Sequence, residues 1–245
     1  NFNDVVSQFR IEGTVESVSP IGNGLINETL RVKTVDANTP DYILQRINNA
    51  IFTDVDLLQH NIELVTDHIR HKLMEKGETD IERKCLRFVQ AKDGKTYYKD
   101  ADNLYWRVSV FIPNAVTKEE VNPESAFCCG ETFGNFQNML VDLKEPLGET
   151  IPDFHNMELR LRQLREAVSA DKAGRVASVK DMIAELESYA DEMCLAERLY
   201  REGALPKRIC HCDTKVNNMM FDKDGKVLCV IDLDTVMPSF IFSDY

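Results

Sequence analysis

The chain has 245 residues, of which 43% are apolar and 29% charged, and a formal net charge of −12. This length can bury a sizeable core as one large domain or as two lobes. Nucleic acids and anionic membranes need a basic surface, so we expect neither as a partner. The longest apolar runs, of about five residues, are far too short to cross a bilayer. A small phosphorylated substrate remains possible, because its site needs only a few local cations and a metal ion.

The seven cysteines do not suggest a disulfide framework or a zinc finger. Their number is odd, Cys128 and Cys129 are adjacent, and no pair has zinc-finger spacing. A chain of this length does not depend on disulfides for its core. We therefore expect reduced thiols and a cytoplasmic location.

The first part of the chain has strand patterns and one helix. Residues 11–47 alternate around a glycine turn and end in the β-rich run YILQRIN. A helix is expected from about Asp54 to Lys76, because apolar residues recur there at helical spacing. Asp93-Gly94 lies between two β-prone runs and predicts a hairpin. The run LYWRVSVFIPN then predicts a strand that ends at Pro113.

After Pro113 the pattern becomes helical, with two stripes of apolar residues that we interpret as core-facing. The stripes consist of Met157, Leu161, Leu164 and Val168, and of Met182, Leu186, Tyr189, Met193 and Ala196. The sequence thus predicts an α+β protein with a β-rich N-terminal part, a connection near Pro113 and a mainly helical C-terminal part.

The stretch ICHCDTKVNNMMFDKDGKVLCVIDLD, residues 209–234, concentrates polar side chains around one turn. Residues 222–225 form the turn of a predicted β-hairpin. A hairpin returns the chain to its starting edge, so Asn218 before the first strand should lie near Asp232 after the second. An amide oxygen and a carboxylate together suit Mg²⁺. Asp213 lies on the same loop and could accept a hydroxyl proton, while Lys215 supplies a charge for a phosphoryl group.

Other interpretations of this stretch exist. Cys210, His211 and Cys212 could form a metal site, but in an extended strand His211 points away from the two cysteines. Three consecutive ligands without a distant partner make a poor zinc site. A single His-x-Asp occurs in many loops, and carboxylates after a strand are commonly solvated or cap a helix. The ordered combination with Asn218 and the hairpin is what favours phosphoryl transfer.

The segment HCDTKVNNMMFDKDGKVLCVID resembles the catalytic segment of kinase-fold enzymes, with His-x-Asp, an Asn five residues after the Asp, a hairpin and a metal-binding Asp. The IDLD ending is similar to that of aminoglycoside phosphotransferases and choline kinases. Within that branch, GNGLINETLRV, YILQRIN and HCDTKVNNMMFD…VIDLDTVMP resemble N-acetylhexosamine 1-kinases most closely.

This resemblance implies a two-lobed, protein-kinase-like α+β fold, with an antiparallel N-terminal sheet and one helix. It implies an N-terminal nucleotide-binding lobe over residues 1–112, a hinge over 113–117 and a mainly helical catalytic lobe over 118–245. Relatives continue with further helices that complete the acceptor pocket, so we expect the last lobe to be incomplete at its C-terminus.

The resemblance also implies roles for individual residues. Asp213 would be the catalytic base and Lys215 would contact the γ-phosphate. Asn218 and Asp232 would hold Mg²⁺, with Asp234 as a helper. His211 would brace the catalytic loop.

ATP would bind to the N-terminal lobe and the hinge. In that lobe Arg46 stands where protein kinases have a phosphate-pairing Lys, and only one of Gln45 and Arg46 can face the nucleotide. Glu63 could pair with Arg46 or could simply be an exposed helix charge. His155 is expected to pack under the catalytic loop. The expected nucleotide-binding residues are Gly22, Asn23, Gly24, Asn27, Arg46, Ile112 and Asn114.

The leading hypothesis is an ATP- and Mg²⁺-dependent kinase that phosphorylates the anomeric hydroxyl of a sugar, GlcNAc or GalNAc by resemblance. One alternative is a kinase of another small acceptor, such as an aminoglycoside, an amino alcohol or homoserine. A nucleotide-binding pseudokinase module is the second alternative, and the intact set of catalytic residues weighs against it. The sequence does not predict an oligomeric state.

Overall fold

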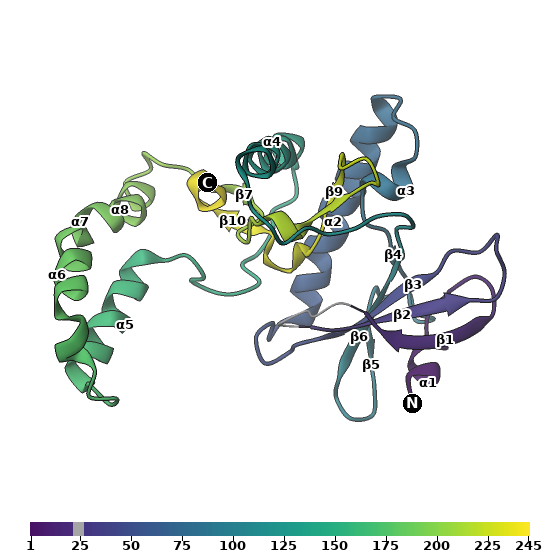
Figure 1. Cartoon of the computed structure of the whole chain (residues 1–245), viewed down its shortest axis with the longest axis horizontal. Helices are drawn as coiled ribbons and strands as arrows, with labels where there is room; N and C mark the ends of the chain where they lie inside the picture. Colours follow the sequence, from purple (N-terminus) through teal and green to yellow (C-terminus); the bar gives the residue numbers. More distant parts are fainter. Residues whose placement is uncertain (22–26) are drawn as a thin grey trace.

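The structure is a computed structural model that describes residues 1–21 and 27–245. Figure 1 shows an N-terminal sheet, a long helix between it and the C-terminal part, and a helical arm at the far side. The fold class is the predicted one: α+β, with an antiparallel sheet first and most helices later.

The N-terminal sheet has six strands in the order β1-β2-β3-β6-β4, with β5 also paired to β6, and all pairs are antiparallel. One face of the sheet buries an apolar cluster with the short helix α1. The elements are α1 (Phe2–Val6), β1 (Val15–Pro20), β2 (Glu28–Thr34), β3 (Tyr42–Ile47), β4 (Phe88–Val89), β5 (Tyr98–Lys99) and β6 (Tyr105–Val110).

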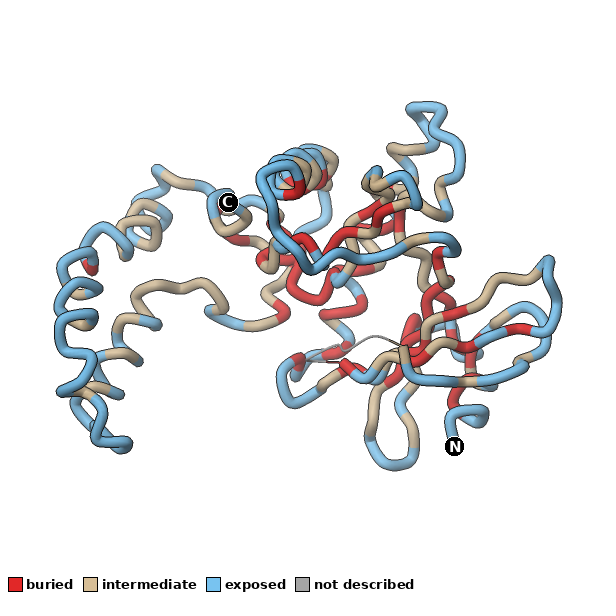
Figure 2. The backbone as a smooth tube through the Cα atoms, viewed as in Figure 1, coloured by how far each residue is buried: buried red, intermediate tan, exposed pale blue. Residues whose placement is uncertain are grey.

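Helix α2 (Val55–Glu75) joins the two parts of the protein. Its first turn is fixed by Asp54, whose side chain accepts a hydrogen bond from the Leu57 N–H at 2.9 Å. Its apolar stripe is buried in a cluster that also contains Phe136 and Leu140 of α4 (Pro123–Leu140) and Leu233 beyond the sheet. Packing of one helix against both parts fixes their relative position. Figure 2 shows that the buried backbone gathers around this helix. Helix α3 (Ile81–Lys84) follows α2.

Two short β-ribbons form the centre of the C-terminal part. The strands β8 (Met219–Phe221) and β9 (Val227–Val230) make the predicted hairpin, and β7 (Arg208–Cys210) pairs with β10 (Met237–Ser239). Single 3₁₀ turns surround them: η2 (Val216–Asn218), η3 (Leu233–Thr235) and η4 (Ile241–Asp244).

The remaining helices form an arm that stands apart from the centre in Figure 1. They are α5 (Met157–Ala170), η1 (Val176–Val179), α6 (Lys180–Ser188), α7 (Ala190–Met193) and α8 (Leu195–Arg201). The two predicted stripes do lie on helices, but the prediction that they are core residues was wrong. Met182 is 65% exposed and Tyr189 is 52% exposed. Members of both stripes line one small cavity in the arm, where two facing layers of helix leave them partly exposed.

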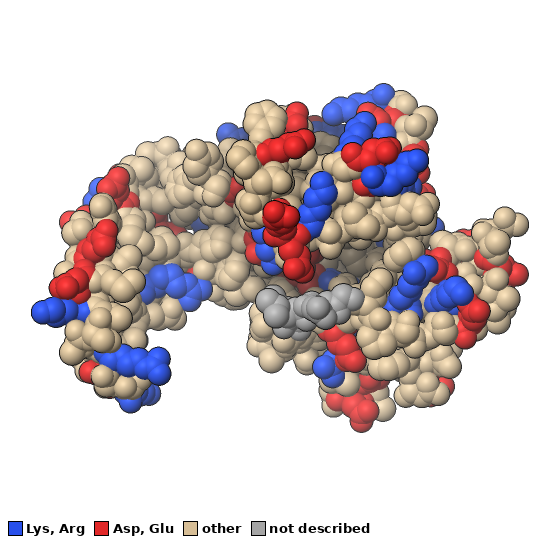
Figure 3. All heavy atoms as spheres, in the orientation of Figure 1, with Lys and Arg blue, Asp and Glu red and all other residues tan. Residues whose placement is uncertain are grey.

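Within the described residues, no helix has both the length and the apolar character that crossing a membrane requires. On the face shown in Figure 3, acidic and basic side chains are interspersed.

Candidate active site

The β8–β9 hairpin brings the two ends of the catalytic stretch together. The Asp222 side chain accepts hydrogen bonds from the Asp224 and Lys226 N–H groups, both at 2.9 Å, and Gly225 takes the positive φ of +81° that the turn requires. At the open end, the Ile231 N–H donates to the Asn218 carbonyl oxygen at 2.9 Å. Asn218 therefore lies beside the residue that precedes Asp232, as the hairpin predicts.

Asp213, Lys215 and Asn218 contact one another on the loop before the hairpin. The Asn218 Nδ2 group donates to the Asp213 carbonyl oxygen at 2.8 Å and to the Asp213 Oδ2 oxygen at 3.1 Å. The Lys215 Nζ group lies 2.7 Å from the same Oδ2 oxygen. Asn218 is only 3% exposed, whereas Asp213 is half-buried and Lys215 exposed. Both cationic and amide donors thus orient the Asp213 carboxylate.

His211 fixes the loop from below. It is fully buried, its Nε2–H donates to the Ile231 carbonyl at 2.9 Å, and its ring packs edge-on against Phe133 and Phe136. Burial lowers the pKa of His211, so the ring is neutral. This is the bracing role that the sequence resemblance implies.

Asp244 in η4 also holds the loop, and sequence reasoning missed it. Its carboxylate accepts hydrogen bonds from the His211 N–H at 2.8 Å and from the Cys212 N–H at 2.7 Å. Gln137 of α4 donates to the same carboxylate at 2.8 Å. No local pattern signals this contact, because the partners are over 30 residues apart in the sequence.

Asp232 is at the entrance to η3 in the left-handed conformation, with φ +58°. Asp232 is exposed as a residue, although neighbouring protein atoms partly desolvate its carboxylate and the Asp234 carboxylate lies close enough to repel it. Burial, and then repulsion from Asp234, raise the pKa of Asp232 to about 6, although Arg107 and Lys215 oppose the shift. A cation bound here would relieve this repulsion.

Asp234 is 2% exposed, and both of its carboxylate oxygens have protein partners. Arg107 of β6 donates from Nη1 to Oδ1 at 2.5 Å, and Asn27 donates from Nδ2 to Oδ2 at 2.7 Å. Arg107 is itself 3% exposed and was not predicted as a site residue. The sequence signal was a single charge inside the otherwise uncharged and mostly apolar strand LYWRVSVFI.

The predicted nucleotide-binding residues are spread along the sheet and the linker. Gly22, Asn23 and Gly24 lie outside the described residues. Arg46 is exposed and pairs with Glu28 at 3.2 Å, whereas Glu63 accepts a hydrogen bond from Thr96. Gln45 instead shares a sheet face with Arg107 of β6, whose Nε–H donates to the Gln45 Oε1 oxygen at 3.0 Å and whose Nη1 reaches Gln59 of α2.

The predicted hinge follows β6. Ile112 is 3% exposed, and Asn114 has a φ of +54° with its carbonyl accepting a hydrogen bond from Arg83 at 3.2 Å. Val116 then pairs with Phe221 of β8 through two backbone hydrogen bonds of 2.8 and 2.9 Å. The linker is thus joined directly to the catalytic hairpin.

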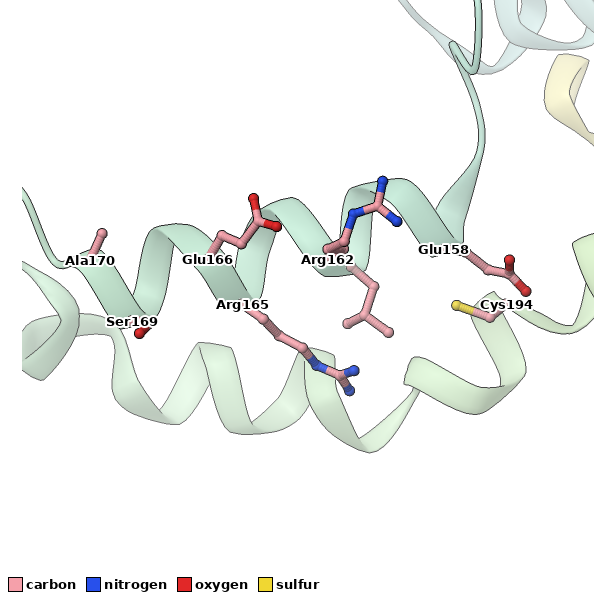
Figure 4. A pocket seen from close by; sticks show the side chains of 8 residues that line it. Glu158, Arg162, Arg165, Glu166, Ser169, Ala170 and Cys194 are labelled. Carbon is pink, nitrogen blue, oxygen red and sulfur yellow. The ribbon is translucent and has the colours of Figure 1, made fainter.

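Two cavities of the C-terminal part lie at different distances from the catalytic loop. One of about 750 Å³ lies in the arm between α5 and Cys194, where Figure 4 shows Arg162 and Arg165 among its lining side chains, away from the catalytic loop. A second, of about 60 Å³, is lined by His155 and Cys212 and adjoins the loop. His155 stacks on Phe154, and burial lowers its pKa.

The donor atoms fit Mg²⁺ and do not fit zinc. Both side-chain hydrogen bonds of Asn218 within the described residues use Nδ2, which leaves Oδ1 available, and the backbone bond to Ile231 brings Asn218 near Asp232. One amide and one carboxylate, completed by phosphate oxygens and water, are typical of Mg²⁺. No group of three or more His, Cys, Asp or Glu in the described residues could hold a metal.

The model of the phosphotransferase enzyme family matches residues 17–245. That range includes the catalytic loop, the hairpin and the N-terminal sheet. The chain belongs to the phosphotransferase enzyme family. Its resemblance to this family at the sequence level is therefore confirmed.

Several solved structures share the fold at low sequence identity. An aminoglycoside phosphotransferase from Alicyclobacillus acidocaldarius is 18% identical with a TM-score of 0.58, over 97% of this chain and 67% of that one. An amicoumacin kinase, in complex with AMP-PNP, Ca²⁺ and Ami, is 15% identical with a TM-score of 0.60, over 99% and 66%. A structure of the GDP and kanamycin complex of an APH(2") enzyme is 14% identical with a TM-score of 0.55, over 96% and 73%. The chain thus spans about two-thirds of the length of the first two proteins.

Proposed function

We propose that the protein is an ATP- and Mg²⁺-dependent kinase that transfers the γ-phosphoryl group to the anomeric hydroxyl of a sugar, an N-acetylhexosamine such as GlcNAc or GalNAc. The observation that carries the kinase part is the contact of Asp213 with Asn218 and Lys215, at the end of a hairpin that returns to Asp232. The sugar part is supported by the sequence resemblance of the glycine-containing loop and the YILQRIN strand.

In this proposal Asp213 is the base. Its Oδ2 oxygen is held by Asn218 and Lys215, which would leave the other carboxylate oxygen to accept the proton of the hydroxyl. A positioned carboxylate can accept the hydroxyl proton as the new bond forms. Lys215 is exposed enough to contact the γ-phosphate as well, and its charge would offset the negative charge that gathers there.

The Asn218 Oδ1 oxygen and the Asp232 carboxylate are the proposed ligands of Mg²⁺. When bound, Mg²⁺ neutralises phosphate charge and orients the phosphoryl group. Asp234 was predicted as a helper ligand, but Arg107 and Asn27 already occupy its two oxygens. We therefore assign the metal to Asn218 and Asp232 alone.

ATP is proposed to lie under the N-terminal sheet. Gly22, Asn23 and Gly24 would cover the phosphates, and the backbone around Ile112 and Asn114 would meet the adenine. Arg46 could reach a phosphate only by leaving Glu28, because its present side chain pairs across the strand with that residue. A cytoplasmic location, where ATP and Mg²⁺ are available, agrees with this activity.

A second candidate is a kinase of a cationic acceptor such as an aminoglycoside. It is favoured by the fold relatives, among which are an aminoglycoside phosphotransferase and an amicoumacin kinase, and by the net charge of −12. An acidic protein attracts polycationic acceptors.

The test is to incubate the protein with ATP, Mg²⁺ and a panel of N-acetylhexosamines, other sugars, amino alcohols and aminoglycosides, and to follow ADP release and the phosphorylated product. Formation of a sugar 1-phosphate that is lost in Asp213→Ala supports the leading proposal. Turnover only with a cationic acceptor supports the second candidate. Nucleotide binding without turnover of any acceptor would contradict both.

A further inference from the structure

The buried surroundings of Asp234 connect the N-terminal sheet to the metal-binding turn. Arg107 on β6 and Asn27 just before β2 each donate to one carboxylate oxygen, at 2.5 and 2.7 Å. Thr150 donates from Oγ1 to the Asp234 carbonyl at 2.7 Å. We call these four residues the Asp234 latch. Its members come from both parts of the protein and converge on one residue of η3.

Arg107 is fixed in place by further contacts. Its Nε–H donates to Gln45 at 3.0 Å, and its Nη1 also reaches the Gln59 Oε1 oxygen of α2 at 3.4 Å. Gln59 is in turn bound to Thr96 through the carbonyl at 3.0 Å and the hydroxyl at 3.1 Å. Burying an ion pair is costly unless its hydrogen-bonding groups find partners, and these amide contacts give partners to the Arg107 Nε and Nη1 groups. Among the described Lys and Arg residues, Arg107 is the buried one.

The contacts of the latch are made at Asp234, two residues after Asp232 in the sequence. Asp232 has a left-handed φ of +58°, which is unfavourable for a residue with a side chain, so the surrounding structure must hold it there. Asp234 is the nearest residue with fixed contacts on both its backbone and its side chain. Rotation of the η3 turn would move both aspartates together, because a single residue separates them.

We propose that Arg107 and Asn27 are positioning residues that hold Asp234, and that Asp234 in turn holds the Asp232 carboxylate where it can bind Mg²⁺. This inference rests on the proposed function only for the identity of the metal site. Arg107 is the arginine of the N-terminal sheet that contacts Asp234, whereas Arg46 pairs with Glu28.

Charge repulsion and positioning predict opposite changes in Mg²⁺ affinity when Arg107 is removed. Arg107 is a cation close to the metal site, so simple charge repulsion predicts that its removal tightens Mg²⁺ binding. If Asp234 were itself a metal ligand, removing Arg107 would also free it and again tighten binding. Positioning predicts the opposite sign, because an unheld Asp234 no longer fixes Asp232. Loss of a group that orients a metal ligand typically weakens metal binding about 10- to 100-fold.

The test measures the Mg²⁺ concentration that half-saturates binding of a fluorescent ATP analogue to the full chain, with no acceptor present. We expect Arg107→Met to raise it by about 10- to 100-fold, Arg107→Lys to recover part of the loss, and Thr150→Val to cause a smaller loss without any change of charge. Lys33→Met is the matched control, since it removes an exposed strand cation paired with Glu16 and should leave the value unchanged.

A second measurement is independent of metal. In the metal-free protein, amide hydrogen exchange over residues 231–236 should be faster in Arg107→Met and Thr150→Val than in the wild type. Unchanged or tighter Mg²⁺ binding in Arg107→Met, or unchanged exchange, would overturn the proposal. If Arg107→Met does not fold, Thr150→Val decides by the same two measurements. Mg²⁺-dependent nucleotide binding without phosphorylation of any acceptor would contradict the proposed function and leave the latch standing.

Discussion

Substituting Asn218 by Asp separates the two roles of this side chain. The variant keeps an oxygen that can bind Mg²⁺ but replaces the Nδ2 donor by a second oxygen. Asn218 now donates to the Asp213 carbonyl at 2.8 Å and to its carboxylate at 3.1 Å. Asn218→Asp removes both hydrogen bonds and places a second carboxylate next to that of Asp213.

The size of the effect follows from these two contacts. A neutral hydrogen bond contributes about 1 kcal/mol and one to a charged group about 1.5–3 kcal/mol. If Asp213 must be held in this orientation to accept the proton, a loss of ~3 kcal/mol corresponds to a rate about 100-fold lower. Repulsion between the two carboxylates would move Asp213 further from its position. Mg²⁺ binding should be kept or strengthened, because the site gains a negative charge.

The assay compares kcat, from ADP release with the acceptor identified in the panel, with the Mg²⁺ concentration that half-saturates nucleotide binding. The matched control is Asn217→Asp, the same change at the exposed neighbouring residue, which should behave as the wild type. A kcat of Asn218→Asp within threefold of the wild type would refute the role of Asn218 in orienting Asp213. Weaker Mg²⁺ binding in this variant would refute its role as a ligand.

Three further predictions concern stability and pH. The pKa of Asp232 is raised from 3.8 to about 6, so the metal-free protein loses stability as pH rises from about 4 through about 6. Asp232→Asn should therefore stabilise the metal-free protein at pH 7.5 by about 1 kcal/mol, because solvent screening reduces the ~3 kcal/mol that the full shift would give. The same variant should abolish Mg²⁺-dependent ATP binding. Lower stability of this variant in urea would contradict it. Burial lowers the pKa of His211 from 6.5, so below about pH 6.5 the unfolded chain binds one more proton than the folded protein. Stability should therefore fall as pH drops, by up to ~1.4 kcal/mol per pH unit. His211→Gln should flatten this dependence between pH 7.5 and 5.5, and an unchanged slope would count against the buried neutral ring. Asn61 is fully buried and bonds the Gly148 carbonyl at 2.8 Å and the Val236 carbonyl at 3.1 Å, so Asn61→Ala should lower the free energy of unfolding by about 3 kcal/mol, with the exposed His60→Ala as control.

Much of the catalytic hairpin could be predicted from the sequence because its geometry is local. The turn at 222–225 and the β-prone runs on either side determine which residues face each other, and so place Asn218 near Asp232. The helix predicted from Asp54 to Lys76 is confirmed as Val55–Glu75. It could be predicted because both of its signals, the periodic apolar residues and the N-cap Asp54, lie within one continuous segment.

The contacts that the sequence did not reveal join distant segments. Arg46 and Gln45 are neighbours on β3, and only the pairing of the strand with its neighbours decides which of them points toward α2. The alternation of a strand showed only that Gln45 and Arg46 must lie on opposite faces of the sheet. Arg107 pairs with a residue 127 positions later, and Asp244 with the loop 32 and 33 positions earlier. Such pairs depend on tertiary packing, which hydrophobic periodicity does not encode.

The central claim is that Asp213, Asn218 and Asp232 act together on Mg²⁺-bound ATP and an acceptor hydroxyl. The most direct measurement is ³¹P NMR of the reaction of ATP, Mg²⁺ and an N-acetylhexosamine with the wild type and with Asp213→Asn. We predict a sugar 1-phosphate signal with the wild type and its loss in Asp213→Asn, although that variant still binds ATP and Mg²⁺. An equal product signal from both proteins would contradict the claim.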